Sequence, residues 1–65
     1  MTKSEITNSL IEAGLDRFLV GSFWQGNDCF VGGDDLDRCK PSAITALVKT
    51  AAPLVTDKGL VFQAR

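Results

Sequence analysis

The sequence contains no histidine and no tyrosine, and its 65 residues include only two cysteines. Histidine is the side chain most often used in general acid–base catalysis, so an enzyme would have to work with Asp, Glu, Lys or Cys. A structural zinc site needs four Cys or His ligands, which this chain cannot supply. We therefore expect a protein that is not an enzyme and that uses no metal or other cofactor.

An excess of basic residues and a long apolar run are also missing. Seven Lys and Arg residues stand against eight Asp and Glu residues, and the net charge is −1. Nucleic-acid binders of this size usually carry a basic excess on one face, so binding to DNA or RNA is disfavoured. No run approaches the roughly 20 apolar residues of a membrane helix, and Glu5 and Asn8 interrupt any signal-peptide core. The composition indicates a soluble cytoplasmic protein without a membrane partner.

The two cysteines, Cys29 and Cys39, are too few for a disulfide framework, and no CxxC motif occurs. We favour two reduced thiols that act as small core residues, with a single disulfide as the alternative. Arg38 and Lys40 flank Cys39, which makes it the better candidate for a reactive thiol. A nucleophilic cysteine also needs a base nearby, and the sequence offers no histidine for that role.

The length allows one small domain, residues 1–65. Hydrophobic residues make up 45% of the chain, which is ordinary for a globular protein and argues against disorder. Domains this small bury roughly 60% of the surface of the unfolded chain, so their stability is marginal.

Two segments have the pattern of amphipathic helices. Thr2-Lys3-Ser4-Glu5 matches a capping box and predicts a helix over residues 2–14 that Gly14 ends. Pro41 suits the first position of a second helix, which Pro53 should end near residue 51 or 52. The apolar stripes are Ile6, Leu10 and Ile11 in the first helix, and Ile44, Leu47, Val48 and Ala51 in the second.

Residues 18–33 between these helices have the pattern of a β-hairpin. Residues 18–24 predict one strand, residues 25–28 the turn, and residues 29–31 the returning strand. Residues 60–63 predict a further strand, with a short partner at 54–56. The fold class that follows is α+β in the order α-β-β-α-β, with a three- to four-stranded antiparallel sheet and two helices on one face.

An acidic cluster, Asp34, Asp35 and Asp37, follows the hairpin, and Asp28 lies in its turn. Three interpretations remain open: a solvated loop, a weak divalent-cation site, or an acidic patch that meets a basic partner. The cluster lacks the twelve-residue spacing and final Glu of an EF-hand. No Lys-Ser/Thr follows Gly32-Gly33, so a turn is favoured there over a phosphate-binding loop.

One face of the sheet should stay uncovered, because its strands carry large apolar side chains on both faces and only two helices are available. The exposed set is either Leu19, Phe23 and Phe30 or Phe18, Val20, Trp24 and Val31, depending on the register.

We therefore expect a non-catalytic protein-binding module, such as an inhibitor, adaptor or accessory subunit, that occludes a partner's surface. The partner is another protein or a second copy of the chain. The alternatives are a nucleic-acid mimic that uses the acidic residues 28–37, and a single-stranded nucleic-acid binder that stacks bases on the sheet aromatics. The expected contact residues are Leu19, Phe23, Trp24, Phe30, Asp34, Asp35 and Asp37.

Overall fold

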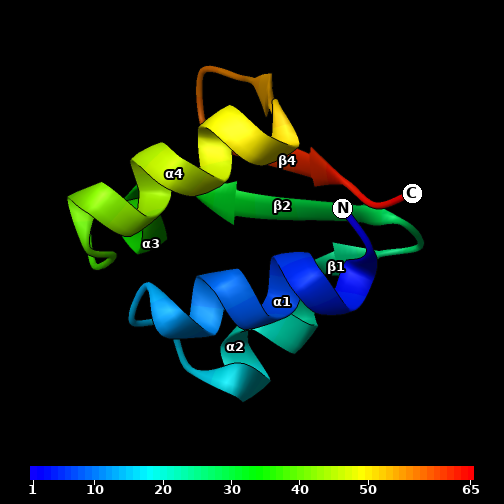
Figure 1. Cartoon of the computed structure of the whole chain (residues 1–65), viewed down its shortest axis with the longest axis horizontal. Helices are drawn as coiled ribbons and strands as arrows, with labels where there is room; N and C mark the ends of the chain where they lie inside the picture. The colour runs from blue at the N-terminus through cyan, green and yellow to red at the C-terminus, as the bar shows by residue number, and fades with distance from the viewer.

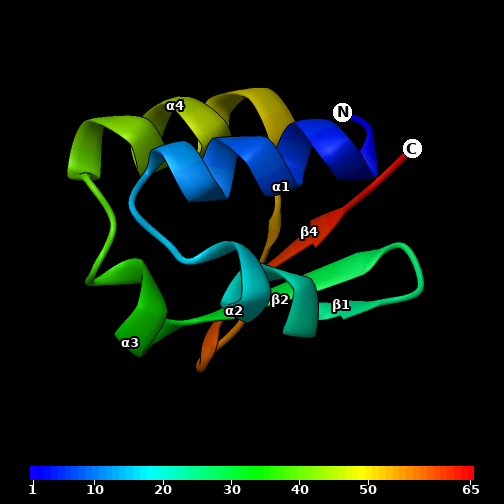
Figure 2. The same ribbon diagram turned by 90° about the horizontal axis from the view of Figure 1, so that it is seen from below.

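The computed structural model describes every residue from Met1 to Arg65. Its elements, in chain order, are α1 (Lys3–Glu12), α2 (Arg17–Ser22), β1 (Trp24–Gln25), β2 (Asp28–Gly32), α3 (Gly33–Leu36), α4 (Pro41–Ala51), β3 (Leu54–Val55) and β4 (Gly59–Gln63). The four strands form one antiparallel sheet, and α1 and α4 lie side by side on one of its faces (Figures 1 and 2). The predicted α+β fold is thus confirmed.

Both predicted helices form with the ends that the sequence indicates. The Glu5 N–H donates to Thr2 Oγ1 at 3.1 Å, and the Thr2 N–H donates to Glu5 Oε1 at 2.9 Å, which completes the capping box of α1. This backbone hydrogen bond to the carboxylate holds the pKa of Glu5 below its ordinary value. α4 begins at Pro41, and Ala52 adopts a left-handed conformation (φ 47°) just before Pro53.

The strand predicted over residues 18–24 is wrong, because most of this segment forms helix α2. Asp16 is its N-cap: Oδ1 accepts hydrogen bonds from the N–H groups of Phe18 (2.8 Å) and Leu19 (3.2 Å). Helical spacing leaves Phe18 exposed, whereas a strand would have placed it on the same face as the fully buried Val20. The hairpin survives only as the two-residue strand β1 paired with β2.

The acidic segment after β2 is also not a loop. Residues 33–36 form the short helix α3, which packs against the ends of β2 and β4. Asp34 and Asp35 lie in its first turn, where negative charge interacts favourably with the exposed N–H groups of a helix. Of the three earlier interpretations, the loop is therefore replaced by a helical turn.

The strand order is β1-β2-β4-β3, so β2 and β4 form the centre of the sheet. Cys29 faces Phe62 across this central pair, and the next pair is Phe30 with Val61. The two chain ends meet beside the sheet (Figure 1), where the Arg65 N–H donates to the Met1 carbonyl oxygen at 3.0 Å.

The hydrophobic core fills the space between the sheet and the two long helices, and α2 and the loops close its sides. Phe62, from β4, is its largest side chain and is fully buried. The ten buried core residues are Ile6, Leu10, Ala13, Leu15, Val20, Cys29, Val31, Cys39, Leu47 and Phe62.

Candidate functional site

The face of the sheet opposite α1 and α4 carries no helix (Figure 2). Because side chains alternate along a strand, the register places Phe30, Val61 and Leu54 next to one another on this face, from three adjacent strands. We call these three residues the outer row. Phe30 is 42% exposed and Leu54 is 55% exposed, while Val61 between them is half-buried.

Polar and bare positions border the outer row. Asp28, two residues before Phe30, is exposed on the same face and pairs with Gln63. On the other side, Gly32 pairs with Gly59. The outer row is therefore a small apolar strip across three strands, with the Asp28 carboxylate along one side and bare backbone along the other.

The acids of α3 continue from that bare side, because α3 starts directly after Gly32. Asp34 and Asp37 are exposed, and Asp35 is half-buried. No group of three Asp, Glu, Cys or His side chains in the chain is close enough to hold a metal ion. The arrangement offers negative charge beside the outer row and no ligand set for a cation.

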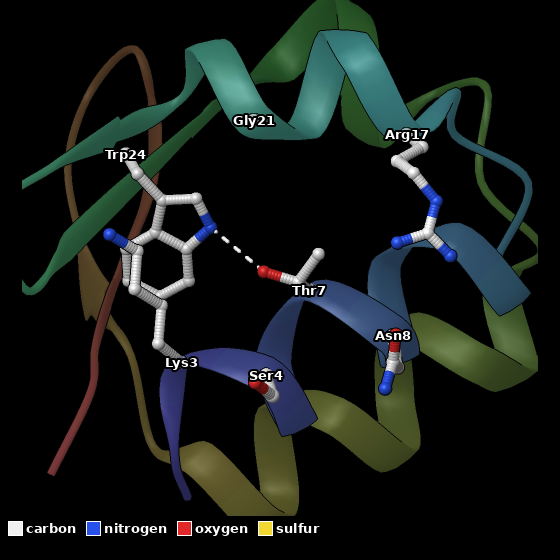
Figure 3. Close-up of a pocket in the computed structure, with 7 residues that line it drawn as sticks. All are labelled: Lys3, Ser4, Thr7, Asn8, Arg17, Gly21 and Trp24. Carbon is white, nitrogen blue, oxygen red and sulfur yellow. Dashed lines mark hydrogen bonds between the residues drawn. The ribbon is translucent and has the colours of Figure 1, made fainter.

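A second feature is an open cleft of about 400 Å³ between α1 and α2. Figure 3 shows Trp24 at one end and the Arg17 side chain at the other, extending toward Asn8 of α1. Its lining has no acidic residue and only one hydrophobic one. The lining residues are Lys3, Ser4, Thr7, Asn8, Arg17, Gly21 and Trp24.

Two contacts fix the Trp24 end of the cleft. The indole Nε1–H donates to Thr7 Oγ1 at 2.9 Å (Figure 3). Lys3 Nζ lies 5.0 Å from the ring centroid, a cation–π distance, and donates to the Gly26 carbonyl oxygen at 3.3 Å. The indole is thus held between α1 and the hairpin turn, and it faces away from the outer row.

The two cysteines are buried and both are free thiols. Burial raises the pKa of Cys29 to about 11. Burial, and then the nearby Asp35 carboxylate, raise the pKa of Cys39, whose Sγ–H donates to the Asp35 carbonyl oxygen at 3.4 Å. A raised pKa keeps a thiol protonated and weakly nucleophilic, so neither cysteine has the lowered pKa of a reactive thiol.

The residues expected to form one contact surface lie in four places. Phe30 is on the outer face, Trp24 is in the cleft, and the three aspartates are on or beside α3. Leu19 and Phe23 are half-buried against the core, although the Phe23 carbonyl oxygen accepts the Phe30 N–H at 3.1 Å.

Sequence reasoning missed Val61 and Leu54 as neighbours of Phe30, and it missed the cleft. The alternation in residues 60–63 already separates Val61 from Leu60 and Phe62, so that signal was present. No signal in the sequence indicated the cleft, since Arg17 and Asn8 come from two helices and neither segment predicts how these helices pack together.

No protein-family model, curated protein or solved structure matches this chain. The longest helix, α4, has 11 residues, and no helix is both long and apolar enough to cross a membrane.

Proposed function

We propose that this chain is a non-catalytic protein-binding module that occludes a partner's surface through the uncovered face of its sheet. The observation that carries the proposal is the outer row, three apolar side chains left side by side on a sheet face that no helix covers. Contiguous apolar surface rimmed by polar groups is typical of interaction sites. An aromatic side chain such as Phe30 is the kind of residue that supplies much of the affinity at an interface.

Charge around the outer row favours one kind of partner, a protein surface with an apolar centre and a basic rim. Asp28 lies on the same face as Phe30, and α3 adds Asp34 and Asp37 next to the far end of β2. Asp57 and Lys58 in the neighbouring turn offset each other. Complementary charge speeds association and selects partners more than it adds affinity. The three aspartates therefore guide the partner's approach, and the outer row supplies most of the affinity.

The positions of the aromatic residues support this function over base stacking. Trp24 lies in the cleft with its Nε1–H bonded to Thr7, and Phe18 lies on α2. Only Phe30 is an exposed aromatic residue of the outer face, whereas single-strand binders stack successive bases on several rings. The proposal includes a cytoplasmic setting, which two free thiols support, since disulfides are common in oxidising compartments.

Affinity capture from a lysate of the source organism, with mass-spectrometric identification, tests the outer row. Three baits are compared: the wild type, F30T/V61T on the outer row, and F18S, which removes an exposed Phe elsewhere. Threonine keeps a high strand propensity, so the double variant should fold. We expect a protein retained by the wild type and F18S and absent with F30T/V61T; equal retention by all three baits would overturn the proposal.

The acidic rim is tested on the captured protein by measuring association rates at low and high salt. The variant D28N/D34N/D37N should associate more slowly than the wild type at low salt, and the difference should shrink as salt screens it. Equal rates at low salt would remove the rim from the mechanism. Sedimentation of the wild type tests the competing occupant: self-association lost in F30T/V61T would place a second copy on this face and contradict a basic-rimmed partner.

A further inference from the structure

The cleft between α1 and α2 shares no residue with the outer row and plays no part in the proposed function. We propose that it binds a small organic phosphate monoester, with the phosphate at the Arg17 end and the organic part toward Trp24.

The charge of the lining favours an anion. Arg17 and Lys3 bring two positive charges, and none of the seven lining residues is acidic. The only hydrogen bond among the lining side chains joins Trp24 to Thr7 (Figure 3), so the Arg17 guanidinium has no partner among them. A guanidinium presents five N–H donors in a planar fork that suits phosphate oxygens.

Neutral donors complete the site. The Thr7 hydroxyl accepts from the indole N–H, which leaves its own proton free to donate. Ser4 and Asn8 follow on the same side of α1, at the i and i+4 positions, and both line the cleft. Figure 3 shows Asn8 on the Arg17 side of the cleft and Thr7 beside Trp24, so the phosphate would meet the guanidinium fork and the Asn8 amide, while the hydroxyl groups of Thr7 and Ser4 would meet the organic part.

The size of the cleft calls for more than inorganic phosphate. Its volume is about 400 Å³, whereas one water occupies about 30 Å³ of the liquid. Small-molecule sites start at about this size, roughly 300 Å³. The Trp24 indole, held in place by Thr7 and Lys3, closes the end opposite Arg17, with its Nε1 edge toward Thr7 (Figure 3). An organic group attached to the phosphate would fill that end.

Gly21 supplies an independent observation. It lies inside α2 on the wall of the cleft, and a Cβ at this position would meet no atom within 4 Å. Nothing in the packing therefore requires glycine here, although glycine lowers helix stability relative to alanine. A side chain larger than alanine at position 21 would extend from α2 into the cleft between Arg17 and Trp24 (Figure 3).

Trp24 is the only tryptophan, so its fluorescence reports directly on the cleft. The wild type is titrated with phenyl phosphate, ribose 5-phosphate, inorganic phosphate and ribose. We expect saturable changes with at least one ester, weaker binding of inorganic phosphate and no response to ribose. The absence of saturation by either ester at millimolar concentrations, or equal affinity for inorganic phosphate, would overturn the proposal.

Three variants locate the binding. R17Q should weaken ester binding by about tenfold to a hundredfold, the usual effect of losing a hydrogen bond to a charged group. K49Q removes the same charge from the exposed face of α4 and should change affinity little. G21L should block the cleft and abolish binding while thermal unfolding stays at or above that of the wild type. Equal losses in R17Q and K49Q, or full binding by G21L, would contradict the assignment.

Discussion

The two faces of the sheet are made by the same strands and differ in what covers them. On the inner face, Cys29, Val31 and Phe62 are fully buried beneath α1 and α4. On the outer face of the same two strands, Phe30 is exposed and Val61 is half-buried. A shift of one residue along a strand thus separates a side chain that holds the fold from one that is free to bind.

Under the proposed function, stability and binding depend on alternate residues of a single strand pair. A small domain depends on every buried side chain, since its total stability is only roughly 0.05–0.15 kcal/mol per residue. Phe30, Val61 and Leu54 add little to that core and lie next to one another, and such adjacent exposed apolar side chains are typical of a contact surface.

The largest effect is expected from Phe62→Ala compared with Phe30→Ala. Truncating a buried Phe costs about 3–5 kcal/mol, which is most of the stability of a domain this small, so Phe62→Ala should unfold at or near room temperature. Phe30→Ala, which removes the same atoms from a ring 42% exposed, should cost about 1 kcal/mol. Urea denaturation followed by circular dichroism measures both. If Phe62→Ala does not fold, Phe62→Leu can be measured in its place. Equal losses in the free energy of unfolding for the Phe62 and Phe30 variants would contradict the difference between the two faces.

The next prediction concerns the bare end of the outer face, where Gly32 and Gly59 pair. A Cβ on Gly59 would overlap the Val31 carbonyl oxygen and lie 2.8 Å from Gly32 Cα, both of them backbone atoms. A Cβ on Gly32 would meet only ordinary contacts, the nearest 3.8 Å away on Phe30. We expect Gly59→Ala to cost about 2 kcal/mol or more and Gly32→Ala less than about 1 kcal/mol.

Thermal unfolding of the two alanine variants checks this difference. If Gly59→Ala proved as stable as Gly32→Ala, the strands would not approach as closely as described. The end of the sheet would then be bare for a reason other than backbone contact.

A smaller effect should appear at high pH, because Cys29 is sealed on the inner face. Burial raises the pKa of its thiol to about 11, whereas in the unfolded chain it titrates near its ordinary value of 9.0. Between these two values the unfolded state has lost the proton and the folded state has kept it, so stability falls as pH rises. The slope attributable to Cys29 is about 1.4 kcal/mol per pH unit.

Urea denaturation of the wild type and Cys29→Ala at several pH values between 8 and 11 measures the slope. The alanine variant should be less stable at pH 8 and should lose stability less steeply above pH 9. Parallel pH dependences in the two proteins would mean that the thiol is not sealed from water.

Much of the fold could be predicted because its signals are local. The capping box at Thr2 and Glu5 and the prolines at 41 and 53 fix the ends of α1 and α4, and each acts within one or two turns of chain. The alternation in residues 60–63 gave β4 in the same way. These elements account for the layers of the molecule.

Residues 18–24 were misassigned because two local signals conflict there. Phe, Val and Trp are enriched in strands, and that preference suggested β-structure. Asp16, two residues before the segment, is an N-cap residue, and Leu19, Val20 and Phe23 have helical spacing. The segment forms a helix because the Asp16 carboxylate accepts hydrogen bonds from two N–H groups and because Val20 is buried in the core. Phe18 is the one large apolar residue of the segment that the helix leaves exposed.

The candidate sites were harder to predict than the elements. The outer row depends on the pairing of β2, β4 and β3, and the cleft depends on how α1 packs against α2. Register and packing join residues far apart in the sequence, such as Phe30 with Val61 or Asn8 with Arg17. The alternation in residues 60–63 separates Val61 from Leu60 and Phe62, but no local signal pairs Val61 with Phe30 or brings Asn8 near Arg17.

The smallest effect is expected at Phe18, and it decides between the two structures considered for this segment. In a strand, Phe18 and Val20 would share a face and respond alike to substitution; in α2, Val20 is fully buried and Phe18 is 87% exposed. Phe18→Ser should therefore change the free energy of unfolding by no more than about 0.5 kcal/mol, whereas Val20→Ser places a hydroxyl in the core and should destabilise strongly. Denaturation of the two variants under the same conditions makes the comparison. A large loss in Phe18→Ser would mean that this ring is covered, and it would then no longer serve as the exposed control for the outer row.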